Sequence, residues 1–163
     1  MVPLISFVTF NHAGLNARNL TALLNTNDDF ELYIIDNNSV DDTWNFIESL
    51  NDPRIVCKKR FDLNRGLVYA LNYVLSKRKK DQYFITMDSD VCIESKDWIS
   101  KFMRGFELFD DLGIGIIPLC RCHLKTSCAI LLLYFFDKSI IISFENIFPL
   151  IIGLQAINCM LFS

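Results

Sequence analysis

The chain has 163 residues, enough for one domain with a buried core, and it is mildly acidic, with a formal net charge of −3 and a pI near 5.3. This balance leaves no basic field for nucleic acid, and the run Lys77-Arg78-Lys79-Lys80 suits the negative end of a helix better than an anionic lipid surface. The six cysteines show no disulfide framework, and Met1-Val2-Pro3 leads into a strand-like run rather than a signal peptide, so we expect a reducing, cytoplasmic setting.

Strand-like and helix-like patterns alternate along the first two thirds of the chain. The predicted strands cover residues 4–10, 31–36, 54–59, 83–87 and 112–117. Helices are predicted over 16–25, after a capping box formed by Ser39 and Asp42, from Gly66, and after Ser95 as an N-cap. Their core-facing residues are predicted to be Leu20, Leu23, Leu24, Trp44, Ile47, Leu50, Leu67, Ala70, Leu71, Val74, Leu75, Ile99, Phe102, Met103 and Phe106. Strict alternation predicts an α/β fold, a three-layer α/β/α sandwich with a mainly parallel sheet.

Polar side chains follow three of the predicted strands. Right-handed crossovers bring the carboxyl ends of parallel strands to one rim, so Asn11, Asp36 and Asp88 should face the same crevice. Asp88 and Asp90 are separated by one small residue, directly after an apolar strand. Adjacent carboxylates repel each other unless a divalent cation joins them. An ordinary acidic turn is the alternative at this point.

A rim with these side chains suits a nucleoside diphosphate carried with a metal. Carboxylates hold Mg²⁺ or Mn²⁺, and a glycine at a helix start lets the backbone approach phosphate closely. The chain has no Gly-x-x-x-x-Gly-Lys loop, no Gly-x-Gly-x-x-Gly and no Gly-x-Ser-x-Gly elbow, which excludes P-loop, Rossmann and α/β-hydrolase sites.

Four segments resemble the family 2 glycosyltransferases of GT-A fold, in the order and at the separations of that family, and together they span roughly residues 4–117. They are Ile5-Ser-Phe-Val-Thr-Phe-Asn11, Ile34-Ile-Asp36-Asn-Asn-Ser39-Val-Asp41-Asp-Thr43, Asn64-Arg-Gly66-Leu-Val-Tyr-Ala70-Leu-Asn72 and Met87-Asp88-Ser89-Asp90. The last resembles the Asp-x-Asp motif of the family.

The resemblance implies a metal-dependent, inverting transfer of sugar from a nucleotide-diphosphate donor to an acceptor hydroxyl on a glycan or a lipid-linked carrier. It implies metal ligation of Mn²⁺ or Mg²⁺ by Asp88 and Asp90, and contact of Asp36 with the base. The implied nucleotide-sugar residues are Thr9, Asn11, Asp36, Asn38, Asn64, Gly66, Asp88 and Ser89. A nucleotidyltransferase is ranked lower, because its first loop is typically rich in glycine and lysine.

The chain departs from the family after the Asp-x-Asp strand. Members of the family carry an acidic catalytic base there, often in a Glu-Asp pair, but no such pair follows Asp111. The later acids are Asp137 and Glu145, so the catalytic base stays unassigned. We expect residues 1–117 to form the donor-binding half. The alternative function is a truncated, inactive module that binds only a nucleotide or a partner.

Residues 118–163 form an apolar tail in which five residues are charged. The tail reads as a core-forming half of the domain, a membrane-associated hairpin, or an abnormal end, and peripheral membrane contact is one consequence. No run approaches the 20 or so apolar residues of a clean span. Cys120, Cys122, His123 and Cys128 match no usual zinc spacing, which disfavours a zinc site.

Overall fold

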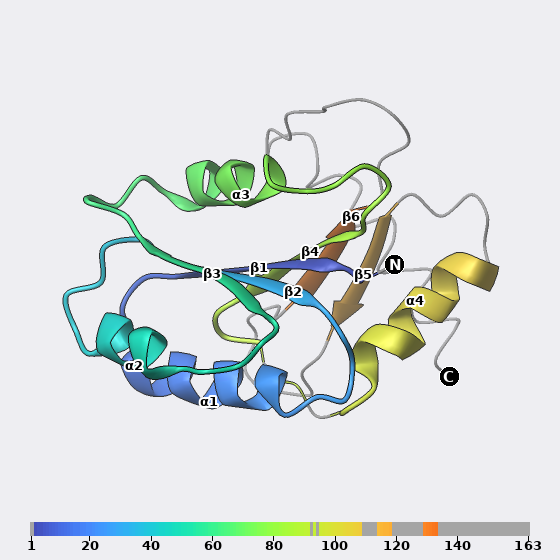
Figure 1. Cartoon of the computed structure of the whole chain (residues 1–163), viewed down its shortest axis with the longest axis horizontal. Helices are drawn as coiled ribbons and strands as arrows, with labels where there is room; N and C mark the ends of the chain where they lie inside the picture. The colour runs from blue at the N-terminus through green and yellow to red at the C-terminus, as the bar shows by residue number, and fades with distance from the viewer. Residues whose placement is uncertain (1, 92, 94, 109–113, 119–128, 134–163) are drawn as a thin grey trace.

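A computed structural model describes residues 2–91, 93, 95–108, 114–118 and 129–133 of the chain (Figure 1). The cysteine cluster considered for zinc, the late acids Asp137 and Glu145, and most of the apolar tail lie outside the described residues. No helix in the described ranges is long and apolar enough to cross a bilayer.

Strands and helices alternate as the sequence predicts. The strands are β1 (Leu4–Thr9), β2 (Glu31–Asp36), β3 (Ile55–Arg60), β4 (Phe84–Asp88), β5 (Ile114–Pro118) and β6 (Ala129–Leu133). The helices are α1 (Ala13–Leu24), α2 (Thr43–Ser49), α3 (Leu67–Leu75) and α4 (Trp98–Leu108).

The strands form one sheet in the order β3-β2-β1-β4-β6-β5. β3, β2, β1 and β4 are parallel, whereas β6 runs antiparallel to both β4 and β5. The expectation of a mainly parallel sheet is therefore confirmed. β6 lies in the segment for which the sequence left three interpretations open, and its pairing with β4 assigns at least these five residues to the sheet.

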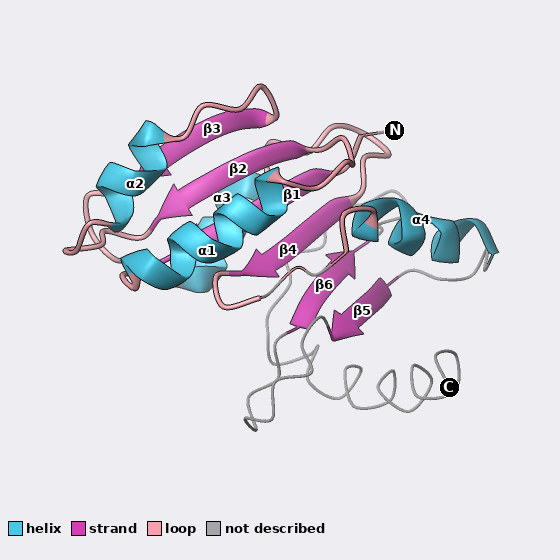
Figure 2. Cartoon of the chain, turned by 90° about the horizontal axis from the view of Figure 1, so that it is seen from below, coloured by secondary structure: helices cyan, strands magenta, loops and turns pink. Residues whose placement is uncertain are grey.

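Helices cover both faces of the sheet, which makes the three-layer sandwich (Figures 1 and 2). α1, α2 and α4 pack on one face, where Ile5, Ile34 and Ile85 contribute to the core. α3 packs on the opposite face, where Ala70 and Val74 meet side chains of β1, β2 and β4. Alternate residues of these strands are apolar on both faces, which is the pattern of strands buried between two helical layers.

Two predicted helix caps are wrong. α2 begins at Thr43 and not after Ser39, because the Ser39 hydroxyl donates to Asp36 instead of capping a helix. α4 begins at Trp98, and Ser95 donates to the side chain of Asp97. In both places the serine hydroxyl bonds to the carboxylate of an aspartate close by in the chain instead of to a helix amide.

The residue that caps α4 is Asp28, from the loop between α1 and β2. Its buried carboxylate accepts hydrogen bonds from the amides of Ile99 at 2.9 Å and Ser100 at 3.3 Å, and from the Ser100 hydroxyl. Free amides at a helix start need acceptors, and a carboxylate there also balances the helix dipole. The cap therefore fixes α4 to the end of α1.

Asp28→Ala is expected to lower the free energy of unfolding by about 2 kcal/mol, because it leaves amides at the α4 start without an acceptor. Urea unfolding would measure the change. Asp29→Ala is the matched control, since this exposed neighbour should change stability by less than about 0.5 kcal/mol. Equal effects of the two substitutions would contradict the capping role.

Candidate functional site

The carboxyl ends of β1, β2 and β4 meet at one rim of the sheet. Thr9 of β1 is level with Asp36 of β2, and Val8 is level with Asp88 of β4. In open α/β sheets, ligands bind at the carboxyl ends of the parallel strands, so this rim is where a ligand site is expected.

An open pocket of about 590 Å³ lies at this rim. Its size is in the range of small-molecule and cofactor sites. It is lined by Val8, Thr9, Phe10, His12, Leu15, Asn37, Asn64, Gly66, Leu67, Asp88, Ser89 and Asp90.

The turn after β4 brings two carboxylates to this pocket. Asp88 ends the strand, and the amide of Val91 donates to the Asp88 carbonyl at 3.2 Å, which closes the turn around Ser89 and Asp90. Although the Asp88 side chain is exposed to the pocket, partial desolvation raises its pKa, and the negative charge of Asp90 raises it further. A cation at this point would relieve the repulsion.

The loop that enters α3 also lines the pocket, through Asn64 and Gly66. The side chain of Asn64 accepts a hydrogen bond from the amide of Gly66 at 2.9 Å. Gly66 has φ +79° and ψ 164°, a conformation that is essentially restricted to glycine. Beyond Gly66 and its two chain neighbours, no atom of the described residues lies within 4 Å of the position that a Cβ would take, so the backbone conformation, rather than crowding, requires glycine here.

Asp36 is fully buried at the end of β2 and is held by partners within the protein. It accepts hydrogen bonds from the Ser39 amide at 3.2–3.3 Å and from the Ser39 hydroxyl, and its carboxylate forms an ion pair with Arg60 Nε at 3.3 Å. Arg60 also donates to the Ser39 carbonyl at 2.5 Å. Asp36, Ser39 and Arg60 thus fix the loop after β2 to β3, and we call these three residues the Asp36 cluster.

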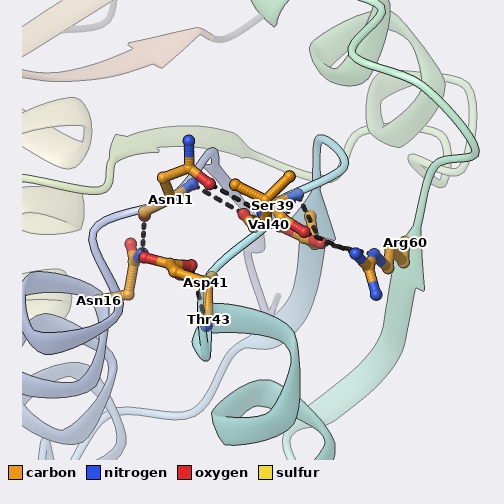
Figure 3. Close-up of polar contacts among 8 residues, drawn as sticks. Asn11, Asn16, Ser39, Val40, Asp41, Thr43 and Arg60 are labelled. Atoms are coloured by element: carbon orange, nitrogen blue, oxygen red, sulfur yellow. Dashed lines mark hydrogen bonds and ion pairs between the residues drawn. The ribbon is translucent and has the colours of Figure 1, made fainter.

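The Asp36 cluster also holds the loop after β1 (Figure 3). The amide of Asn11 donates to the Ser39 hydroxyl at 2.7 Å, and the amide of Val40 donates to the Asn11 side chain at 2.9 Å. Asn11 has φ +57°, and Asn16 of α1 donates to its carbonyl at 2.5 Å. Two loops of the rim are therefore joined in one hydrogen-bonded network.

Asp41 links the same two loops at the start of α1. Its carboxylate accepts from the amides of Thr43 at 3.1 Å and Ala13 at 3.0 Å. The hydrogen bonds from Thr43, and then from Ala13, lower the pKa of Asp41 below its ordinary value. Asp41 is therefore an anion at neutral pH, placed where the helix start carries positive charge.

Six of the residues predicted for the site line the pocket. They are Thr9, Asn64, Gly66, Asp88, Ser89 and Asp90. The pocket lining does not include Asn11, Asp36 or Asn38. Asn11 and Asp36 are joined through Ser39, and Asn38 is half-buried with φ +69°. Their predicted contacts with the nucleotide remain predictions.

The other pocket residues were not predicted for the site: Val8, Phe10, His12, Leu15, Asn37 and Leu67. The prediction of Leu67 as a core residue is wrong, because its side chain is 40% exposed and lines the pocket. Phe10 and Asn37 stand inside the quoted motifs, next to residues that were chosen, so position in the motif was an available signal. Asn37 is buried, and its side chain accepts the Arg65 amide at 2.9 Å, which ties the β2 loop to the α3 loop. Only the fold shows that contact.

Among the described residues, no group of three or more His, Cys, Asp or Glu side chains gathers as a complete cation cage. Two carboxylates beside an open pocket are still a suitable donor set for Mg²⁺ or Mn²⁺. Mg²⁺ commonly takes one or two carboxylates and completes its shell with substrate phosphates and water. The residues present therefore fit a cation that arrives with a diphosphate.

The chain is similar in sequence to a curated glucosyltransferase. The chain is 39% identical over 70 residues to the Escherichia coli UDP-Glc:alpha-D-GlcNAc-diphosphoundecaprenol beta-1,3-glucosyltransferase WfaP, which covers 43% of this chain and 27% of that protein. The chain therefore spans about a quarter of the length of this curated relative.

Solved glycosyltransferases share the fold. The mannosyltransferase PcManGT from Pyrobaculum calidifontis, in complex with GDP-Man and Mn²⁺, aligns with a TM-score of 0.59 and 18% identity over 71% of this chain and 35% of that chain. S. aureus TarS 1–349 in complex with UDP-GlcNAc aligns with a TM-score of 0.60 and 18% identity over 70% of this chain and 33% of that chain. At this identity the likeness shows the fold, which is that of the GT-A glycosyltransferases.

The profile of the family described as "Glycosyl transferase family 2" matches residues 5–125, about three quarters of the chain. This range includes all four segments of the resemblance and every residue of the pocket. With its α/β/α fold and the placement of the Asp-x-Asp turn, the chain belongs to glycosyl transferase family 2.

Proposed function

We propose that the chain binds a nucleoside-diphosphate sugar together with Mn²⁺ or Mg²⁺ and belongs to an enzyme that transfers the sugar to an acceptor hydroxyl. The observation that carries this proposal is the pocket that Asp88 and Asp90 line together with Asn64 and Gly66, in a family 2 chain. The names of the relatives support it: WfaP uses a UDP-sugar, and PcManGT was solved with GDP-Man and Mn²⁺.

Each wall of the pocket has a part in this proposal. Asp88 and Asp90 are the metal ligands, with Ser89 between them. The glycine at the start of α3 lets the backbone approach phosphate, and Asn64 and Thr9 add polar side chains at strand and helix ends. Asp36 and the loops that it joins form the nucleoside side, with Asn11 and Asn38 in those loops.

A direct displacement at the anomeric carbon gives inversion. The acceptor oxygen forms the new bond as the bond to the diphosphate oxygen breaks, and the acceptor proton passes to a carboxylate base. The bound cation would supply positive charge that stabilises the departing diphosphate. We assign the base to no residue of this chain.

Donor binding is assigned to residues 1–117, and acceptor binding to later residues or to parts of a longer protein. WfaP acts on a diphosphoundecaprenol carrier by its name, so a lipid-linked acceptor is the acceptor class we propose. An enzyme with that acceptor works beside a membrane, and a nucleotide donor places it on the cytoplasmic side.

A thermal-unfolding series with UDP, GDP and TDP, each with and without MnCl₂, tests donor binding. One nucleotide with Mn²⁺ should stabilise the protein by about 2.7 kcal/mol at a hundredfold excess over its Kd. Asp90→Ala should remove the metal-dependent part. No metal-dependent shift with any of the three nucleotides would overturn the proposal.

The alternative function is a module that binds the nucleotide but transfers nothing. The chain covers about a third of the solved chains it resembles, which favours this alternative for the chain on its own. Metal-dependent binding without hydrolysis or transfer of the sugar nucleotide would support it. Turnover that Asp90→Ala abolishes would exclude it.

A further inference from the structure

Asn19 of α1 reaches the turn that carries the two carboxylates. Its side chain is fully buried, and its Nδ2 donates a hydrogen bond of 2.6 Å to the carbonyl of Ser89, which is 70 residues further along the chain. Ser89 stands between Asp88 and Asp90, so this bond holds the middle of the turn. Figure 2 shows α1 on the face of the sheet beside the loop that follows β4.

The orientation of the Asn19 amide is determined by its two partners. Arg18 Nε donates to Asn19 Oδ1 at 3.1 Å, and the Ser89 carbonyl can only accept. Exchanging the amide oxygen and nitrogen would place donor against donor and acceptor against acceptor. The side chain is therefore fixed in the one orientation that donates to Ser89.

The position of Asn19 in the helix also needs an explanation. It lies on the buried side of α1, together with Leu20 and Leu23, where an apolar residue would be usual. Burial of an amide is unfavourable unless its hydrogen bonds are made. Here the bonds are made, and the partner is the backbone of the Asp-x-Asp turn.

The loop that follows α1 holds the far end of this segment. The amide of Asn27, just after α1, donates to the carbonyl of Lys96 at 2.7 Å, and Asp28 caps α4. The chain between β4 and α4 is thus held by α1 near its first residue and by the residues after α1 near its last. A segment that is held near both of its ends is preorganised before any ligand binds.

We propose that Asn19 is a positioning residue, which fixes the Ser89 peptide and thereby the separation and direction of the Asp88 and Asp90 carboxylates for a cation bound with a diphosphate. This inference rests on the proposed function. Asn19 is not among the residues that line the pocket, so it acts through the turn. Its effect should appear in metal-dependent nucleotide binding and not in metal-free binding.

Calorimetric titration tests this on Asn19→Leu and Asn19→Ala, two variants that both remove the donor but differ in size. The titrant is whichever of UDP, GDP and TDP gives the largest shift in the series above, in MnCl₂ and in EDTA. The metal enhancement, the Kd in EDTA divided by the Kd in Mn²⁺, should fall about tenfold in both variants, the equivalent of one lost hydrogen bond. The Kd in EDTA should stay within about twofold of wild type.

Asn16→Leu is the matched control, because it removes a second buried asparagine of α1 that bonds to Asn11 and Thr43 rather than to Ser89. Its metal enhancement should equal that of wild type. An equal loss in the control would show that any buried amide of α1 has this effect, and would overturn the positioning role.

The outcomes separate the two proposals. A wild-type protein that binds no nucleotide with metal overturns the proposed function. A wild-type protein that does bind, with unchanged metal enhancement in both Asn19 variants, overturns only the role of Asn19. If neither variant unfolds cooperatively, amide hydrogen exchange of residues 88–91 in the ligand-free wild type tests whether the turn is preorganised. Slow exchange is expected, and fast exchange would overturn the proposal.

Discussion

Asp88→Asn is expected to make the ligand-free protein more stable at pH 7 and to remove its metal-dependent nucleotide binding. Desolvation and the charge of Asp90 raise the pKa of Asp88, so the folded protein holds this proton more tightly than the unfolded chain does. Protonated Asp88 therefore contributes to the stability of the folded protein. This contribution is complete below the pKa of the unfolded chain, about 3.9, and is lost as pH rises through the higher pKa of Asp88 in the folded protein. An amide in this place carries no charge and avoids the loss.

The gain in stability should therefore shrink as pH falls, because the raised pKa lets Asp88 of the folded wild type take up its proton at a higher pH than the unfolded chain does. With Mn²⁺ and nucleotide at neutral pH the order should reverse, because the wild type gains about 2.7 kcal/mol at a hundredfold excess over Kd and the variant gains little. A residue that lowers the stability of the free protein and is required for ligand binding is common at functional sites.

Thermal unfolding between pH 4 and 7.5, with and without ligand, measures both effects. Asp42→Asn is the control, since Asp42 is exposed at the start of α2 and does not line the pocket. It should leave the pH dependence and the ligand shift unchanged. Lower stability of ligand-free Asp88→Asn at pH 7, or a retained metal-dependent shift, would contradict the role assigned to Asp88.

Asp36→Ala is expected to lower the free energy of unfolding by about 3 kcal/mol or more. The substitution leaves the Ser39 amide and hydroxyl and the Arg60 guanidinium without their shared acceptor, in a place where Asp36 itself has no exposed surface. Removing one partner of a buried charged pair typically lowers stability by about 3–5 kcal/mol. Arg60 is 40% exposed and can regain water, so the lower end applies.

Asp36→Asn is the matched comparison, because it keeps the shape and one acceptor oxygen but loses the charge and exchanges the second acceptor oxygen for an NH2 donor. Its loss should be clearly smaller than that of Asp36→Ala in urea unfolding. A double-mutant cycle with Arg60→Met should give a coupling energy of about 1 kcal/mol or more, since the two residues share one network. A loss below about 1 kcal/mol for Asp36→Ala would show that the loops after β1 and β2 do not depend on the cluster.

The sequence predicted the fold and six of the residues that line the pocket for local reasons. Each strand of the first half carries its own apolar run, and α3 carries a full apolar stripe, so their types follow from periodicity. Parallel order then brings strand ends to one rim, and Asp88, Asp90 and Gly66 lie at such ends or at a helix start. Motif residues at the ends of elements are positioned by topology alone.

The arrangement around Asp36 was harder to predict, because it depends on contacts between loops. Ser39 resembles a helix cap, but the fold brings Asp36 and Asn11 within reach, and the hydroxyl bonds to those instead. Asn11 and Asp36 were predicted as ligand contacts, and the fold shows that both also hold the loops. No local pattern records a hydrogen bond between residues 28 positions apart.

The turn after β4 shows best which features the sequence determines and which only the tertiary structure decides. Met87-Asp88-Ser89-Asp90 by itself determined that two carboxylates follow a buried strand, and its place among the other motifs pointed to family 2. Only the tertiary structure brought Asn19 to the Ser89 carbonyl and Asp28 to the start of α4. The reason is physical: carboxylates can be recognised from residue type and spacing, but the groups that hold them in place come from wherever the chain packs against them.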